Sequence, residues 1–315
     1  MVRRFAALLT VFLLALTACG QSGGGSPAAA PAAESRTIRH VQGETTIEGT
    51  PEKVVVMDFG ALDTMKALGL SDTVVGLPKR GLPKFLSEFG DEKYADVGTL
   101  QEPNLETINK LDPDLLIIGG RSAAKYPELS QHWPTLDVSF KTDKGLIDGT
   151  EASATPIAET FGKQAELSEK MAALRTRAQG LESKGAAAGR GLIVMTSGGK
   201  VSLHGENSRF GAIHTILGVP VAKENIATDG HGEPATFELL AEINPDVMFV
   251  VDRDAAIGTE GQNARQILDN ELVHRTKAWQ DQKLVMLDGS RWYIAIHGLD
   301  NAGAMLDEAA AGLEG

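Results

Sequence analysis

The sequence has a single cysteine, few aromatic residues and an excess of acidic over basic side chains. Cys19 has no second cysteine to pair with, which excludes an intrachain disulfide, a cysteine-rich zinc site and a CxxC redox pair. The 42 acidic residues outnumber the 30 lysines and arginines, and the formal net charge of −12 disfavours non-specific binding to nucleic acid or to an anionic membrane surface. The remaining composition, with 42% hydrophobic and 23% charged residues, is typical of a globular protein and excludes collagen-like, coiled-coil and wholly disordered chains.

The first residues have the layout of an export signal. Arg3 and Arg4 precede an apolar run from Phe5 to Leu16. A helix of this length reaches only about 18 Å, short of the roughly 30 Å hydrocarbon core of a bilayer. We therefore expect a signal peptide over 1–18 rather than a permanent membrane span. The sequence Leu-Thr-Ala-Cys that ends at Cys19 resembles the bacterial lipobox, in which the cysteine carries fatty acids such as palmitate; the alternative is an ordinary cleaved signal with an incidental cysteine.

The segment that follows predicts a tether. Residues 19–36 are rich in Gly, Ser, Ala and Pro, a composition that cannot bury apolar area and behaves as a flexible linker. No later apolar stretch approaches eighteen residues, so the rest of the chain is expected to face water. The predicted location is extracytoplasmic, with a lipid anchor in the outer face of the cell membrane, or on the periplasmic side in a cell with two membranes.

Two halves of the chain resemble each other. FGALDTMKALGL at 59–70 is similar to FGAIHTILGV at 210–219, and EPNLETINKLDPDLLIIGGR at 102–121 is similar to EPATFELLAEINPDVMFVVDR at 233–253. In both long segments a short helical pattern ends at Asp-Pro-Asp or Asn-Pro-Asp, where proline stops the helix, and a continuous apolar run follows. Since the order of the segments is the same in both halves, we expect a duplicated βα unit.

The apolar runs predict parallel strands that alternate with helices. Leu115 to Ile118 and Val247 to Val251 are typical of buried parallel strands. The other expected strands are Val54 to Asp58, Val74 to Leu77, Gly191 to Met195 and Leu284 to Leu287, and the expected helices include Ala61 to Leu68, Phe210 to Leu217 and Leu299 to Ala311. The predicted fold is α/β, with an N-terminal lobe over 37–150, a C-terminal lobe over 185–315 and one long amphipathic helix of about 45 Å over 151–184 between them. Ligands of open α/β sheets bind beyond the carboxyl ends of the strands, so residues that follow strands are expected to line a cleft.

Arginines follow the duplicated strands. Arg121 and Arg253 end the two copies of the repeat, and their guanidinium groups are well suited to binding carboxylate and catecholate oxygens. Each could instead cap a helix or pair with a neighbouring carboxylate. Arg209, in the sequence NSRFG, is the candidate for a third cation, whereas Lys79 and Arg80 lie in the loop sequence GLPKRGLPK, where solvated charge is the alternative.

His231 and Tyr293 are candidate metal ligands. His231 lies between glycines in TDGHGEP, and Tyr293 follows the last predicted strand in GSRWYIAIHGL. An imidazole and a phenolate suit ferric iron, but the remaining four positions of an octahedron would have to come from the ligand. A turn histidine and a buried core tyrosine are the alternatives.

Taken together, these motifs resemble the substrate-binding lipoproteins of ferric siderophore ABC importers, most closely the catecholate group that binds petrobactin-type and bis-catecholate complexes. The resemblance covers the lipobox, GLPK, SRFG, HGEPATFE, NPDVMFVVDR and WYIA. It implies the class III periplasmic-binding-protein fold, a pocket with Arg121, Arg209 and Arg253, and iron coordination within the siderophore complex by His231 and Tyr293. The usual small-residue run after the tyrosine motif is here Ala-Ile-His-Gly, which puts the pocket wall near Tyr293 in doubt.

The resemblance also implies a partner. In related proteins one glutamate on each lobe docks onto arginines of an ABC permease dimer. Glu106 and Glu238, which the repeat aligns in the first turns of their helices, are the candidates here, although a first-turn glutamate is also favourable with the helix dipole. No intrinsic cofactor, no nucleic acid and a monomeric protein are expected.

Other functions remain open. Haem, cobalamin or hydroxamate siderophores are alternative ligands for the same architecture. Ser197 and Lys200 fit the SxxK pattern of acyl-serine enzymes, but no SDN or KTG triplet, GxSxG motif or P-loop accompanies them. A zinc or manganese importer would need three or four protein ligands, and His231 has no obvious partners for that. We therefore expect a binding protein rather than an enzyme.

Overall fold

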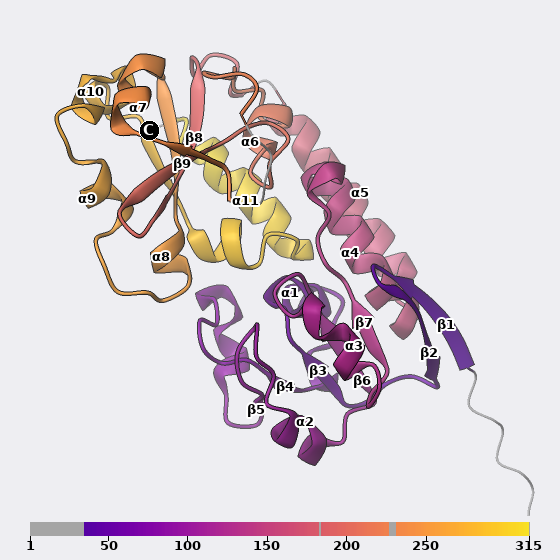
Figure 1. Cartoon of the computed structure of the whole chain (residues 1–315). Coiled ribbons are helices and arrows are strands. Elements are labelled where there is room, and N and C mark those ends of the chain that lie inside the picture. Colours follow the sequence, from indigo (N-terminus) through magenta and orange to yellow (C-terminus); the bar gives the residue numbers. More distant parts are fainter. Residues whose placement is uncertain (1–34, 183, 227–230, 315) are drawn as a thin grey trace, which may run out of the picture. The chain divides into compact units, whose positions relative to one another are not determined.

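The computed structural model describes residues 35–182, 184–226 and 231–314, and all of them belong to one compact unit. Two five-stranded sheets lie in successive parts of this unit (Figure 1). Residues 1–34, which contain the expected signal peptide, Cys19 and most of the expected tether, lie outside the described residues. Within the described residues, no helix has the length and apolarity required to cross a membrane.

The N-terminal sheet is parallel, as the sequence predicts, with the strand order β5-β4-β3-β6-β7. A two-stranded hairpin precedes it. The strands and helices of this part are β1 (Ser35–His40), β2 (Gly43–Glu48), β3 (Val54–Val56), α1 (Phe59–Ala67), β4 (Val74–Leu77), β5 (Ala95–Asp96), α2 (Leu105–Leu111), β6 (Leu115–Ile118), α3 (Tyr126–Leu129) and β7 (Thr135–Asp137). The expected tether extends to residue 36, but Ser35 and Arg36 already belong to β1. Arg36 donates a hydrogen bond to the carbonyl of Thr160.

The C-terminal sheet is mixed, with the order β10-β9-β8-β11-β12. β8 pairs with β11 and β11 with β12 in parallel, whereas β9 is antiparallel to both β8 and β10. The elements are β8 (Gly191–Ser197), β9 (Lys200–His204), α6 (Ala212–Thr215), β10 (Glu233–Ala235), α7 (Phe237–Ile243), β11 (Val247–Asp252), α8 (Arg253–Ala256), α9 (Ala264–Leu268), α10 (Lys277–Gln280), β12 (Leu284–Leu287) and α11 (Leu299–Ala311). The helix expected over 210–217 is thus only the short α6. The antiparallel pair arises from a tight turn at Gly198 and Gly199, whose φ angles of 56° and 74° suit a two-residue hairpin.

The duplication is visible in matching local structures. α2 and α7 begin at side-chain caps, Asn104 and Thr236, and both end at a residue with left-handed backbone, Asp112 or Asn244, immediately before a proline. The aspartate after each proline then accepts a hydrogen bond from the backbone just before a central strand. Asp114 accepts a hydrogen bond from the backbone N–H of Lys53, before β3, and Asp246 accepts one from that of Arg190, before β8.

The expected single helix over 151–184 is wrong. The chain forms two helices, α4 (Gly145–Phe161) and α5 (Gln164–Leu181), which are separated at Gly162. Gly162 has a φ angle of 66°, a left-handed conformation that glycine adopts readily and that ends a helix. Arg175 of α5 reaches back to Asp148 and Glu151 of α4, so the two helices form an antiparallel hairpin rather than one rod.

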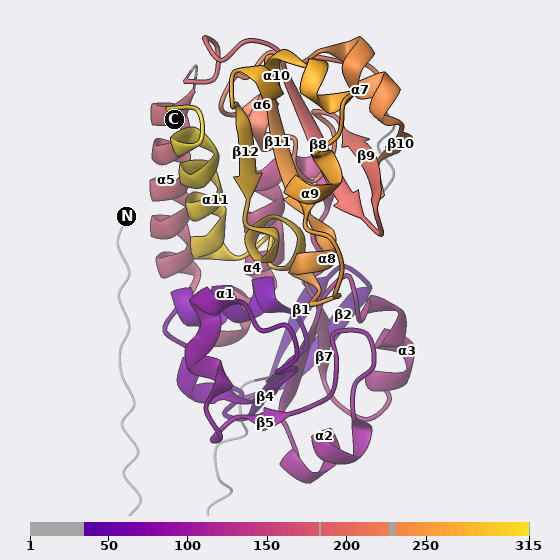
Figure 2. The same ribbon diagram turned by 90° about the vertical axis from the view of Figure 1, so that its left-hand side faces the viewer.

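α5 also lies beside the C-terminal helix α11 and runs in the same direction (Figure 2). Three ion pairs join the two segments, each between residues 130 positions apart: Lys170–Asp300, Arg177–Asp307 and Lys184–Glu314. The first two pairs are seven residues apart, which is close to two helical turns, so they lie on one face of each helix, and the third lies just beyond both helix ends. These exposed pairs add little stability, but they identify the face along which α11 packs.

The central strands of both sheets are covered on both faces. In β6, Leu115 and Ile117 belong to the large central core, whereas Leu116 and Ile118 pack with buried residues of α2 and α3 on the opposite face. β11 repeats this alternation, with Val247 and Phe249 in the central core. Since successive strand residues point to opposite faces, continuous apolar runs indicate strands with no solvent-facing side. The central core extends from α1 and α4 through α5 to α11, and it joins the two sheets.

Candidate functional site

A cleft with a volume of about 730 Å³ lies between the carboxyl ends of the two sheets. Arg121, after β6, and Arg253, after β11, both line it, as the duplicated strand ends predict. The volume is in the range of pockets that hold small organic ligands. The wall combines cationic side chains with apolar ones such as Phe140 and Ile294.

Tyr293 lies at the centre of three arginines. The guanidinium carbons of Arg121, Arg209 and Arg253 lie 4.9, 5.4 and 5.7 Å from the centre of its ring. Each distance is within the range of a cation–π interaction, in which the electron-rich face of an aromatic ring attracts a cation. Arginines from both halves of the chain therefore converge on one tyrosine, inside one cleft.

Hydrogen bonds fix two of these arginines against Tyr293. Arg253 donates from Nε to the phenolic oxygen at 3.0 Å, and Arg121 donates from Nη2 to the backbone carbonyl at 3.3 Å. Burial lowers the pKa of Arg209, with Tyr293 opposing this shift and the nearby charge of Arg121 adding to it. Like charges in a partly desolvated cleft repel each other, so an anion placed among them would be strongly attracted.

The other predicted ligand residues divide into two groups. Arg80 and His231 line the same cleft, which brings a fourth arginine and the candidate imidazole to the site. Lys79 is not among the lining residues, because its ammonium group donates to the backbone carbonyls of Gly90 and Asp91. The expectation that Lys79 binds the ligand is therefore not supported by its position.

The two candidate docking glutamates are exposed and occupy equivalent positions. Glu106 and Glu238 lie in the first turns of α2 and α7, as the repeat predicts. Glu106 also forms an ion pair with Lys110, one helical turn further on, at 2.7 Å.

The SxxK motif adopts a structure unlike that of a nucleophile on a helix. Ser197 is the last residue of β8, Lys200 is the first of β9, and the two pair across the hairpin turn. The hydroxyl of Ser197 accepts a hydrogen bond from Arg253 at 3.1 Å, so the serine belongs to the surroundings of the arginine cluster.

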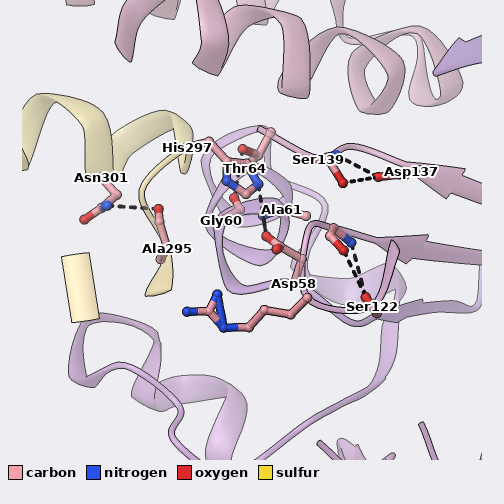
Figure 3. Close-up of polar contacts among 12 residues, drawn as sticks. Asp58, Gly60, Ala61, Thr64, Ser122, Asp137, Ser139, Ala295, His297 and Asn301 are labelled. Carbon is pink, nitrogen blue, oxygen red and sulfur yellow. Dashed lines mark hydrogen bonds and ion pairs between the residues drawn. The ribbon is translucent and has the colours of Figure 1, made fainter. Parts of the chain in front are cut away.

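Asp58 and His297 form a buried pair in the cleft wall that the sequence does not reveal as a pair (Figure 3). His297 Nε2 lies 3.0 Å from Asp58 Oδ1, a close polar contact that lacks the alignment of a full hydrogen bond. Two glycines make room for it. A side chain on Gly60 would collide with the imidazole ring, and one on Gly119 would collide with the carboxylate.

The pKa of Asp58 lies below its ordinary value. Burial on its own would raise it, but the charge and contact of His297 lower it, as does the backbone N–H of Ala61 that the carboxylate accepts at the start of α1. The charge of Arg121 acts in the same direction. A carboxylate is thus kept ionised beneath the arginine cluster, with its own imidazole partner.

Two α/β lobes and a cation-lined cleft between their strand ends define the class of molecule: a substrate-binding protein of the class III type, as the sequence predicts. The chain belongs to the periplasmic binding protein family, whose model matches residues 54–290.

Relatives that match nearly the full chain are named for the compounds that they bind. The chain is 36% identical to the petrobactin-binding protein YclQ of Bacillus subtilis, over 99% of this chain and 100% of that relative. It is 28% identical to the ferric-anguibactin-binding protein FatB of Vibrio anguillarum, over 98% of this chain and 97% of FatB.

Solved structures agree with this family. The crystal structure of YclQ superposes with a TM-score of 0.85 at 37% identity, covering 90% of this chain and 99% of YclQ. The catecholate-siderophore binding protein VctP of Vibrio cholerae has a TM-score of 0.78 at 31% identity, covering 89% of this chain and 99% of VctP. The family resemblance and the two-lobed fold predicted from the sequence are confirmed.

Proposed function

We propose that this protein captures a ferric catecholate siderophore outside the cytoplasm and delivers it to an ABC permease. Its relatives are siderophore-binding proteins of iron import, and two of them are named for petrobactin and for catecholate siderophores. The observation that carries the proposal is the convergence of Arg121, Arg209 and Arg253 on Tyr293 within one cleft.

Recognition in this proposal is electrostatic. Iron(III) with three catecholate dianions is a trianion, and with two it is a monoanion. Guanidinium groups donate paired hydrogen bonds to such oxygens, and in a partly desolvated cleft these bonds are stronger than in water. Arg80 adds a fourth cation at the cleft wall. Because salt screens charge over roughly 8 Å, the acidic surface elsewhere does not cancel this local attraction.

Iron coordination is shared in this proposal. A siderophore with two catecholates leaves two positions of an iron octahedron free, and His231 and Tyr293 are the side chains assigned to them. Arg253 donates a hydrogen bond to the phenolic oxygen of Tyr293 and so holds this oxygen among the arginines of the cleft. The iron arrives and leaves with the siderophore, as cargo.

We also propose that the protein binds without catalysing a reaction. Its relatives are substrate-binding proteins, and the Ser197 hydroxyl is hydrogen-bonded to Arg253 and Asp254, away from Lys200 of the motif. The proposed setting is an extracytoplasmic, monomeric protein that Cys19 anchors to the membrane through lipid. Glu106 and Glu238, one on each lobe, are the proposed contacts with the permease dimer.

Fluorescence titration tests the ligand class. Purified protein is titrated with a ferric bis-catecholate, a ferric tris-catecholate and a neutral ferric trihydroxamate, with haem and cobalamin as further arms. Quenching by the catecholates supports the proposal. Quenching by the trihydroxamate, haem or cobalamin without quenching by either catecholate overturns it. With the bis-catecholate, the charge-transfer absorbance should change on binding and the change should be absent in Tyr293→Phe; an unchanged spectrum would remove Tyr293 from iron coordination.

A further inference from the structure

The turn between β8 and β9 contacts the arginine cluster directly. Ser197 ends β8, and the next two residues, Gly198 and Gly199, form the tight turn that leads into β9. Arg253 and Asp254 begin α8, which follows the neighbouring parallel strand β11. Parallel pairing of β8 with β11 therefore places the serine beside the arginine.

Directional hydrogen bonds connect the turn to Tyr293. Arg253 donates from Nη1 to Ser197 Oγ at 3.1 Å, and Ser197 Oγ donates to Asp254 Oδ1 at 3.3 Å. The other carboxylate oxygen of Asp254 accepts the backbone N–H of Gly198. A hydroxyl can donate only one hydrogen bond. Because Ser197 donates this bond to Asp254, its oxygen accepts the hydrogen bond from Arg253 through a lone pair.

Arg253 is therefore held by two hydrogen bonds, and its Nη1 also lies 3.6 Å from Asp254 Oδ1. Its Nη1 bonds to Ser197 and its Nε bonds to the hydroxyl of Tyr293, and the guanidinium plane is fixed by both contacts. The Nη2 edge is the part of the group that these two bonds do not use. A long arginine side chain loses considerable rotamer freedom when it binds a ligand, and an arginine that is already ordered loses less.

We propose that Ser197 is a positioning residue for anion binding: with its hydroxyl fixed by Asp254, it orients Arg253 so that the Nη2 edge meets the ferric chelate. This inference rests on the proposed function and extends it to a residue that does not touch the iron. It also gives the serine of the SxxK motif a role that requires no catalysis.

Affinity measurements on Ser197 variants test the proposal. We expect Ser197→Ala to weaken binding of a ferric bis-catecholate by about three- to tenfold, the range for loss of one typical intramolecular hydrogen bond. Ser197→Thr, which keeps the hydroxyl, should bind like the wild type. Ser202→Ala removes a serine from β9 of the same hairpin and is the matched control, with affinity unchanged. Equal affinities of Ser197→Ala and the wild type would overturn the proposal.

A double-mutant cycle separates positioning from general damage. If Ser197 acts through Arg253, then Ser197→Ala should have no further effect in an Arg253→Gln background. Additive losses, or a loss in melting temperature that accounts for the weaker binding, would contradict this role.

A measurement without ligand keeps this inference distinct from the proposed function. In the ¹⁵N–¹H spectrum of the ligand-free protein, the Arg253 Nε–H signal is assigned as the peak missing in Arg253→Gln. We expect this peak to shift or broaden in Ser197→Ala and to stay in place in Ser202→Ala. An unmoved peak overturns the role of Ser197 even if the wild type binds ferric catecholates, whereas failure of the wild type to bind any of them overturns the proposed function alone.

Discussion

Asp63 of α1 accepts hydrogen bonds from the backbone N–H groups of Asn301 and its neighbour Asp300, at 3.0 and 2.9 Å. These N–H groups lie in the first turn of α11, where a helix has no internal acceptors. The cap residue of α11 is Gly298, which has no side chain that could accept these hydrogen bonds. The carboxylate of Asp63, more than two hundred residues earlier in the chain, caps the helix instead. The contact joins a helix of the N-terminal lobe to the segment that follows Tyr293 in the sequence.

Replacing this carboxylate should destabilise the protein. We expect Asp63→Ala to lower the free energy of unfolding by about 1–2 kcal/mol, the range for loss of a helix cap together with buried donors left unpaired. Urea denaturation followed by circular dichroism measures the change. Asp63→Asn keeps an acceptor oxygen and should lose less.

Asp300→Ala is the control for this prediction. Asp300 has an exposed side chain that pairs with Lys170, and surface pairs of this kind contribute little. Equal losses in Asp63→Ala and Asp300→Ala would show that the cap across the lobes adds nothing to stability.

The buried pair of Asp58 and His297 should be more sensitive to removal of one partner. His297→Gln leaves an ionised carboxylate in the cleft wall without its imidazole, and we expect a loss of roughly 3 kcal/mol in the free energy of unfolding. The double variant Asp58→Asn/His297→Gln also removes the buried carboxylate charge and should recover part of this loss. Denaturation of Asp58→Asn, His297→Gln and the double variant measures the coupling, and additivity of the two single changes would contradict an interaction between these two side chains.

The elements that the sequence predicts well are those whose signals are local. Continuous apolar runs identified β4, β6 and β12 with their observed bounds. β6 is buried on both faces, which leaves no polar position in the run, whereas β12 keeps an apolar run although Met286 is exposed. Matching positions after duplicated strands placed Arg121 and Arg253 at one cleft, since the carboxyl ends of parallel strands share an edge.

The errors come from contacts that no local pattern encodes. The apolar spacing over 151–184 continues through Gly162, so periodicity indicated one helix although the glycine after Phe161 is a common helix end. Asp58 and His297 are 239 positions apart, and nothing in either local sequence identifies the other as its partner. The role of Ser197 likewise depends on which strand lies beside β8.

Mild acid should weaken the fold through buried histidines. Burial lowers the pKa of His214, although the hydrogen bond from its Nδ1 to the carbonyl of Val219 opposes the shift, and burial also lowers the pKa of His40. The folded state then binds fewer protons than the unfolded state, in which the pKa is about 6.5. The contribution of these histidines to the free energy of unfolding is therefore complete above about pH 6.5. It is lost as the pH falls from there toward the pKa of the folded state.

Melting curves at pH 7.5 and 5.5 measure this effect. We expect a lower melting temperature at pH 5.5, and a smaller pH difference in His214→Asn, whose amide can still donate to the carbonyl of Val219. His132→Asn changes an exposed histidine and should show the same difference in melting temperature between the two pH values as the wild type. An unchanged difference in His214→Asn would show that His214 does not cause the effect.

Single arginine replacements should weaken binding of anionic chelates. We expect Arg121→Gln and Arg253→Gln each to reduce affinity for a ferric bis-catecholate by about tenfold or more, because a charged donor in a partly buried site is lost. Fluorescence quenching at two salt concentrations gives the affinities. Lys79→Gln is the matched control, since Lys79 is engaged with the carbonyls of Gly90 and Asp91, and an equal loss in this variant would indicate a general effect of net charge.

Charge reversal at the docking glutamates should separate transport from binding. Glu106 and Glu238 are exposed on α2 and α7 and do not line the cleft, so Glu106→Lys/Glu238→Lys should bind the ferric siderophore with unchanged affinity. In the proposed docking mode the new lysines would face arginines of the permease dimer and repel them, so we expect iron uptake into cells to fall on the order of tenfold. Glu242→Lys reverses another exposed charge on α7 and should leave uptake intact. Normal uptake with the double variant would exclude this pair as the contact, whereas equal losses in Glu242→Lys would mean that overall charge, rather than these two positions, governs docking.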